Sequence, residues 1–387
     1  MQRSLKLRVF IPLLLLTLSG CGSGTVPQSS AALSSASGSA QSLPITLQRH
    51  NGDDHDLWDD PDHSDSAGFS PASVRLGFFS TNLPLLAAFK QGYFTQEKLT
   101  VTTQQVTTST SLFQSVAANT LDVALSSADN IVNYRLNSNN PVNNNAGTLD
   151  VQMLFGDHLG LGLVLVAQPG ETTASLRGKK CGVDAPDSGF AYVLYDLLKR
   201  QGLTRGVDYT VVPAGGTPVR LNALRARTID CTLLNADSVV RAKAEGFAVL
   251  ASVNDVAVPY LGGVGAARES WVRANPGVAV RFIRAYLRGV LWVRDPTHQD
   301  DAVALLTNAG TPAGLAIEIY DAAVSDPTGL IPDSKVDVPG LRNVLKLRDS
   351  FGGFEHPQNL RFLASQASGL YNLRYLKRAM RTLDLPR

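Results

Sequence analysis

After residue 72, continuous apolar runs alternate with stretches in which apolar residues recur at helical spacing. Val74–Phe79, Leu99–Val106 and Leu121–Leu125 have the composition of short strands, and polar residues follow each of them. Apolar residues then recur at helical spacing, in 85–94 after the first strand and in 111–119 after the second. A strand, a polar cap and a helix in repeated order predict right-handed parallel crossovers in an open α/β sheet.

The same order of elements recurs between Leu176 and Leu250. Strands are predicted at 179–184, 209–214, 228–234 and 247–253, with helices between them. We expect the chain to cross to this second group of strands at Gln168–Gly170 and to return within Asp255–Ala267.

The C-terminal third is predicted to be mostly helical. Val278–Val293 has strong helical periodicity, and we expect the arginines along it to form a solvated face, with contact to a transporter as the alternative; they are Arg281, Arg284, Arg288 and Arg294. The helices of 300–387 are expected to support the first group of strands, and the Asn-rich segment Asn137–Asn145 is expected to be exposed.

Polar side chains gather where the three strands of the first group end. The clusters are Ser80–Asn82, Thr107–Ser111 and Ser126–Ser127. Ligands of open α/β sheets bind beyond the carboxyl ends of the strands, where helix N-termini also offer free backbone N–H groups. Helix capping explains any one cluster, but three clusters at one edge favour a binding site.

These motifs together resemble the periplasmic solute-binding proteins of the nitrate/sulfonate/taurine and thiamine-precursor group. The motifs are Pro84 with Gly92-Tyr93-Phe94, the segment LDVALSSAD, and the later segments 176–184, 212–237 and 271–293. The resemblance implies a type II periplasmic-binding-protein-like α/β fold, in which doubly wound sheets form two lobes joined by a hinge. The first lobe would contain 72–168 and 256–387, and the second 169–255.

Ligand contacts are expected from both lobes. In the first lobe the strand ends indicate Thr81, Asn82, Ser109, Thr110, Ser127, Asp129, Phe155 and Asp157. In the second lobe the resemblance indicates Ser188, Gly189, Phe190, Gly216, Thr217, Asn235 and Asp237. His158 is interpreted as a polar loop residue rather than a catalytic base, because no nucleophile can be paired with it.

The N-terminus predicts export and a lipid anchor. Residues 1–20 have a basic start, an apolar run and small residues before Cys21, as in a secretory signal peptide. Leu18–Cys21 resembles a bacterial lipobox, which implies cleavage before Cys21 and lipid on its sulfur; an incidental cysteine after a plain signal peptide is the alternative. Residues 21–71 are expected to form a disordered linker, and its histidines and aspartates lack the fixed spacing of a metal site.

Cys181 and Cys231 form an even pair in an oxidising compartment. They lie in the first and third strands of the second group, which are neighbours in a doubly wound sheet of order 2-1-3. The strand spacing of about 4.8 Å is compatible with a disulfide. Two buried free thiols are the alternative.

The charge pattern bears on the ligand. The net charge is +2 and no basic cluster stands out beyond the extreme N-terminus, which disfavours nucleic acid. The predicted strand ends carry only acidic charges, and Arg220 lies inside a helix; the acidic residues are Asp129, Asp157, Asp184, Asp187, Asp237 and Asp255. This pattern favours an aminopyrimidine or aminosulfonate type of ligand over a simple oxyanion.

The resemblance implies an extracytoplasmic lipoprotein, in the periplasm or on the cell surface, that delivers a small molecule to an ABC transporter permease. We expect a monomer without cofactor or catalytic activity. A secreted enzyme of the same fold, acting on a small heterocycle, and a sensory ligand-binding protein are the alternatives.

Overall fold

The computed structural model describes residues 69–140, 142, 147–160, 163–325 and 328–383. The predicted signal peptide, Cys21 and the linker up to residue 68 lie outside these residues. Within the described ranges, no helix is both long enough and apolar enough to cross a membrane.

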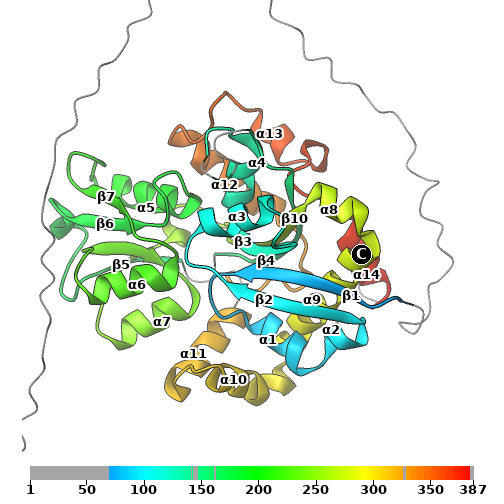
Figure 1. Ribbon diagram of the computed structural model, residues 1–387. Coiled ribbons are helices and arrows are strands. Elements are labelled where there is room, and N and C mark those ends of the chain that lie inside the picture. Colours follow the sequence, from blue (N-terminus) through cyan, green and yellow to red (C-terminus); the bar gives the residue numbers. More distant parts are fainter. Residues whose placement is uncertain (1–68, 141, 143–146, 161–162, 326–327, 384–387) are drawn as a thin grey trace, which may run out of the picture. The chain divides into compact units, whose positions relative to one another are not determined.

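The first sheet has the strand order β2-β1-β3-β10-β4 (Figure 1). Its strands are β1 (Ala72–Phe78), β2 (Leu99–Gln105), β3 (Val123–Ser127), β4 (Val151–His158) and β10 (Gly263–Arg268). β1 pairs in parallel with β2 and β3, as the predicted crossovers require. β10 lies antiparallel between β3 and β4, with Gly263 opposite both Ser127 and His158. The ends of β3 and β4 therefore meet at one edge of the sheet.

The second sheet has the order β7-β6-β8-β5-β9. Its strands are β5 (Val164–Ala167), β6 (Lys180–Val183), β7 (Thr210–Pro213), β8 (Cys231–Leu234) and β9 (Ala248–Ser252). The crossing predicted at Gln168–Gly170 is wrong, because β5 already pairs antiparallel with β8 and β9. The chain crosses between His158 and Val164 instead. A fully buried apolar strand carries no local sign of which sheet it joins.

Polar residues begin the helices that follow the strands. Asn82, Thr108, Ser127 and Ser188 each accept a backbone N–H at the start of a helix. The helices of the first part are α1 (Leu83–Lys90), α2 (Tyr93–Gln96), α3 (Ser109–Ala117), α4 (Ala128–Leu136), α5 (Gly189–Arg200), α6 (Thr217–Arg225) and α7 (Ala236–Ala244). Short polar side chains hold their first turns, because these N–H groups have no partner within the helix.

The C-terminal helices pack on helices of both sheets. They are α8 (Glu269–Ala274), α9 (Pro276–Arg294), α10 (Gln299–Asn308), α11 (Ala313–Val324), α12 (Val338–Ser350), α13 (Leu360–Leu363) and α14 (Arg374–Arg381). α9 packs on α1 and α14, as expected for support of the first sheet. However, α12 also packs on α5 and α11 on α7, so this region holds helices of both sheets (Figure 1).

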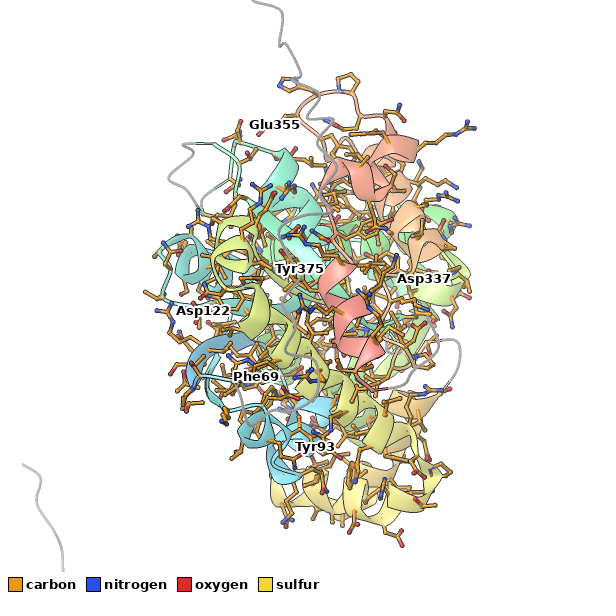
Figure 2. The ribbon with its side chains drawn as sticks, turned by 90° about the vertical axis from the view of Figure 1, so that its right-hand side faces the viewer. Phe69, Tyr93, Asp122, Asp337, Glu355 and Tyr375 are labelled. Atoms are coloured by element: carbon orange, nitrogen blue, oxygen red, sulfur yellow. A yellow bond between two sulfur atoms is a disulfide. The ribbon has the colours of Figure 1, made fainter. Side chains whose placement is uncertain are left out.

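The arginines of α9 do not form the predicted solvated face. Arg281 and Arg284 are 6% and 9% exposed. The Arg284 guanidinium forms an ion pair with Glu97, and Arg281 donates to the Glu97 carbonyl at 2.8 Å. Both guanidinium groups also lie over the Phe69 ring, which is labelled beside α9 in Figure 2. Helical periodicity places charged residues on the solvent face. It failed here because each buried arginine has a polar and an aromatic partner, which compensate for its burial.

The Asn-rich segment is likewise not fully exposed. Asn137 and Asn140 are buried, and the Asn137 amide donates to the carbonyl of Gly353 and to the side chain of Asn133, both at 2.8 Å. Residues 141 and 143–146 lie outside the described ranges.

Candidate functional site

A cavity of about 120 Å³ lies at the strand ends and is lined from both sheets. A single water molecule needs only about 10–15 Å³ of such space, so the cavity takes a molecule of several non-hydrogen atoms. The predicted ligand contacts that line it are Thr81, Asn82, Ser127, Asp157, Ser188, Phe190, Gly216, Thr217 and Asn235. It is further lined by Phe78, Phe79, Ser80, Leu125, Ser126, Asn130, His158, Asp184, Arg220 and Gly262.

Asp157, next to last in β4, forms the acidic part of the first-sheet wall. Its carboxylate accepts the Tyr286 hydroxyl at 2.7 Å and the Asn82 amide at 3.3 Å. Asn82 also accepts the N–H of Leu85 at 2.9 Å, so the start of α1 fixes this amide. Asp157 is 5% exposed and has no arginine or lysine partner in an ion pair among the described residues. It is therefore a buried carboxylate held by neutral donors.

His158, the last residue of β4, lies beside Asp157 in the same wall. Its Nε2 atom is 4.0 Å from the Asp157 carboxylate. Its ring fills the space over Gly262 and Gly263, where any side chain would overlap it. Burial lowers the pKa of His158 below its ordinary value, although Asp157 acts in the opposite direction. The imidazole is therefore neutral at pH 7, and its Nδ1 atom has no partner among the described residues.

Three helices of the second sheet begin at the cavity. Ser188, Gly216 and Asn235 are the N-cap residues of α5, α6 and α7. Ser188 accepts the N–H of Ala191 at 3.3 Å, whereas Gly216 and Asn235 make no side-chain cap. No cap side chain occupies the N–H groups in the first turns of α6 and α7, so these groups remain for a ligand.

Arg220 corrects the expectation that no basic side chain reaches the site. It lies in α6, is 1% exposed and lines the cavity. It donates to the Leu233 and Gly215 carbonyls at 2.9 and 2.6 Å, and to the Thr217 hydroxyl at 3.2 Å. Burial lowers the pKa of Arg220 to about 10, against the raising effect of nearby Asp184.

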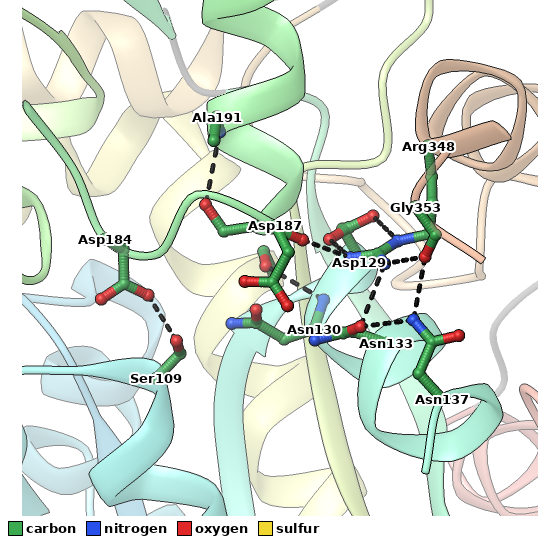
Figure 3. A network of polar contacts seen from close by, with 12 residues as sticks. Ser109, Asp129, Asn130, Asn133, Asn137, Asp184, Asp187, Ala191, Arg348 and Gly353 are labelled. Carbon is green, nitrogen blue, oxygen red and sulfur yellow. Dashed lines mark hydrogen bonds and ion pairs between the residues drawn. The ribbon is translucent and has the colours of Figure 1, made fainter. Parts of the chain in front are cut away.

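Direct contacts join the two sheets beside the cavity. The Ser109 hydroxyl donates to the Asp184 carboxylate (Figure 3). The Gly216 N–H donates to the Thr107 carbonyl at 2.7 Å. Arg348 of α12 donates to the Asp187 carbonyl at 2.7 Å, just before α5. These bonds bring residues of the two sheets together around the cavity.

Asp129 was predicted to contact the ligand, but the structure places it against Arg348 (Figure 3). The guanidinium donates to both Asp129 oxygens, at 2.8 and 2.7 Å, and the two side chains are 0% and 1% exposed. Burial alone would lower the pKa of Arg348, but the Asp129 carboxylate raises it above its ordinary value. Asp129 thus compensates a buried cation instead of lining the cavity.

Five other predicted contacts also lie off the cavity wall. Phe155 is buried and its ring packs on Tyr286, 4.7 Å between centroids. Asp237 pairs with Arg241 within α7. The remaining three are Ser109, bonded to Asp184, Thr110, beside the Tyr134 hydroxyl, and Gly189, against the Asp129 side chain.

Some lining residues were not predicted as ligand contacts, and the sequence offered different evidence for each of them. Asp184 follows β6 directly, in the position already used to select Asn82 and Ser127. Phe78 and Phe79 end an apolar strand, which made them core candidates rather than ligand contacts. Gly262 enters the wall only because β10 returns beside β4, and no local pattern predicts that pairing. Among the described residues, no group of three or more His, Cys, Asp or Glu could hold a metal ion.

The two sheets of mixed strands and the two chain crossings between them define an α/β protein of the type II periplasmic-binding-protein fold. The family model described as NMT1/THI5 like matches residues 80–299, more than half of the chain. The chain therefore belongs to the NMT1/THI5-like family.

Solved structures show the same fold at low sequence identity. The periplasmic nitrate-binding protein of Synechocystis PCC 6803 is 11% identical, with a TM-score of 0.67 over 82% of this chain and 90% of that one. The alkanesulfonate-binding protein of Xanthomonas axonopodis pv. citri, bound to MOPS, is 15% identical, with a TM-score of 0.61 over 79% and 99%. The ligand-binding component of an ABC-type import system from Staphylococcus aureus is 14% identical, with a TM-score of 0.63 over 80% and 99%. A search of curated proteins gave no match.

Proposed function

We propose that the protein is a lipid-anchored extracytoplasmic solute-binding protein that delivers a small organic molecule to an ABC importer. The observation that carries this proposal is the cavity, because residues of both sheets line it. Structures of the same fold are described as nitrate-binding, alkanesulfonate-binding and ABC import components. The partners are then a small ligand and a permease, and the protein acts as a monomer in the periplasm or on the cell surface.

Each sheet is proposed as the core of one lobe, and the two crossings as the hinge. The second lobe then begins after His158, earlier than the predicted residue 169, because β5 belongs to the second sheet. The bonds from Ser109 to Asp184 and from Gly216 to Thr107 fit a closed arrangement around the cavity. Hinge closure over a ligand creates a form that a permease can recognise.

The charges of the cavity support a nitrogen-bearing ligand of the aminopyrimidine or aminosulfonate type. Asp157 and Asp184 supply two negative charges, and Arg220 supplies one positive charge that Asp184 partly offsets. One buried carboxylate therefore remains without a cationic partner. A simple oxyanion would add a second uncompensated negative charge, whereas an amine would offset the first.

No catalytic role is proposed. A secreted enzyme would need a base within reach of its substrate, and His158 is the histidine that lines the cavity. Among the described residues, no lining serine or threonine makes a hydrogen bond to the His158 ring, so no activated nucleophile is formed there. Turnover of the bound molecule would favour the enzyme, and signalling without uptake would favour a sensory protein.

The test is to identify what the protein carries. Mass spectrometry of the purified chain should detect one copurified small molecule, and calorimetry should show that it rebinds after removal at about 1:1. The same molecule should be released unchanged after long incubation. A protein that carries no molecule, and binds no candidate in a screen of nitrogen- and sulfur-containing solutes, would contradict the proposal.

The lipid anchor is tested separately. Cys21→Ser should move the protein from membranes to the soluble extracytoplasmic fraction, because its sulfur would no longer carry acyl chains. Fractionation followed by immunoblotting measures this change, and Ser29→Ala, in the predicted linker, is the control that should leave the distribution unchanged. A Cys21→Ser protein that stays with membranes as the wild type does would contradict the anchor.

A further inference from the structure

We propose that Asp157 and His158 together form a subsite for an amino group of the ligand. The inference rests on the proposed function and names the ligand chemistry that the cavity selects. Both side chains line the cavity at the end of β4, and both are more than nine-tenths buried.

The first argument is the unused hydrogen-bonding capacity of Asp157. An ionised carboxylate has about four acceptor positions, and the described residues donate to it through the Tyr286 hydroxyl and the Asn82 amide. Both donors are neutral. A buried carboxylate without a cationic partner is costly, so a ligand ammonium would be drawn to it.

The second argument is the unpartnered Nδ1 atom of His158. The nearest carboxylate to the ring is that of Asp157, on the Nε2 side at 4.0 Å. A neutral imidazole has one N–H donor and one acceptor nitrogen. If the proton is on Nε2, facing Asp157, then Nδ1 is an acceptor, and it is buried without a donor among the described residues. A ligand N–H group supplies the donor that this atom lacks.

The third argument is that the wall is built to hold these two groups. Tyr286 and Asn82 bond to each other as well as to Asp157, so two linked side chains fix the carboxylate. Gly262 and Gly263 leave the space that the His158 ring occupies. Side chains held this firmly discriminate between ligands, because little ordering is required on binding.

The closing experiment compares two pairs of probes by calorimetry. One pair is 2-aminoethanesulfonate and ethanesulfonate, and the other is 4-amino-2-methylpyrimidine and 2-methylpyrimidine. In at least one pair the amine should bind the wild type about 10- to 100-fold more tightly than its amine-free counterpart, as expected for a hydrogen bond to a charged group. The within-pair ratio does not depend on how much of a variant is folded.

The variants assign that ratio to residues. Asp157→Asn and His158→Phe, which keep the size of the side chains, should each reduce the ratio at least about fivefold. Asp196→Asn is the matched control: it also neutralises a carboxylate, but one on α5 that pairs with Arg200 and does not line the cavity, so the ratio should stay within about twofold. An unchanged ratio in Asp157→Asn and His158→Phe would overturn the assignment.

The outcomes separate this inference from the proposed function. Equal or tighter binding of the amine-free members by the wild type would overturn the amino subsite and leave a solute-binding role intact. If none of the four probes binds the wild type, the ligand classes are wrong, and the subsite inferred for them falls too. The solute-binding role then depends on the copurified molecule alone.

Discussion

Ser127 and Ser188 show at the residue scale how one hydroxyl can belong both to a helix and to a site. Ser127 accepts the N–H of Asn130 at 3.4 Å, and Ser188 that of Ala191 at 3.3 Å. Both distances are long for an N–H donor. Both residues also line the cavity, so the weak caps leave the hydroxyl groups able to turn toward a ligand.

Ser127→Ala and Ser188→Ala should each weaken binding of the copurified ligand by about tenfold or more, because a buried partner would lose its hydrogen bond. The loss of unfolding free energy should stay below about 1 kcal/mol, since the caps are poorly formed. Calorimetry and melting curves measure the two effects. Asn359→Ala removes the N-cap of α13 away from the cavity and should lower stability alone. Unchanged affinity in both serine variants would remove them from the site.

Arg220 and Arg348 explain why part of the site could not be predicted at this scale. Each is charged, fully buried and inside a helix: Arg220 in a helix expected between strands of the second group, and Arg348 in the region expected to be mostly helical. Their positions in the fold depend on partners outside their own helices: Leu233 for Arg220, and Asp129, 219 residues away, for Arg348. Local pattern places a charged helical residue on the surface by default, because isolated burial of charge is unfavourable.

At the scale of elements, prediction succeeded where a signal is local. β1, β2 and β3 and the caps at Asn82, Thr108 and Ser127 follow from apolar runs and from polar residues that end them. The assignment of β5 failed because four apolar residues suit either sheet equally. Pairing with β8 and β9 is decided by contacts across 60 or more residues of chain, which no window of sequence contains.

The pairing of β6 with β8 has a covalent consequence. Cys181 and Cys231 are directly opposite in these parallel strands, with their Cα atoms 4.5 Å apart, and a disulfide joins them. The bond closes a separation of 50 residues. In the chain-entropy account such a loop contributes about 4 kcal/mol to the free energy of unfolding.

Thiol labelling of the denatured, unreduced mature protein should therefore label neither cysteine. Reduction of the denatured protein before labelling should expose both, which serves as the control. Replacing both by alanine should lower the free energy of unfolding by up to about 4 kcal/mol in urea titrations. Full labelling of both residues without reduction would contradict the disulfide.

At the scale of the whole molecule, the proposed mechanism requires the two lobes to separate and close. Gly216 is at a contact that such closure would form: its N–H donates to the Thr107 carbonyl at 2.7 Å. A Cβ atom at Gly216 would lie 3.0 Å from that carbonyl oxygen and 3.3 Å from the Phe79 ring. The backbone oxygen has little room to move, so a branched side chain here would hold the lobes apart.

Gly216→Val should therefore block closure without harming either lobe. Its φ of −65° is accessible to any residue, so no backbone strain is introduced. We expect the copurified ligand to bind at least tenfold more weakly, because contacts from one lobe would be lost, while the melting temperature of the ligand-free protein stays within about 2 °C.

Small-angle scattering should show that saturating ligand reduces the radius of gyration of the wild type but not of the variant. Gly314→Val, where a Cβ atom meets nothing within 4 Å, is the control and should close normally. A Gly216→Val protein that contracts and binds as the wild type does would show that this contact is not part of closure.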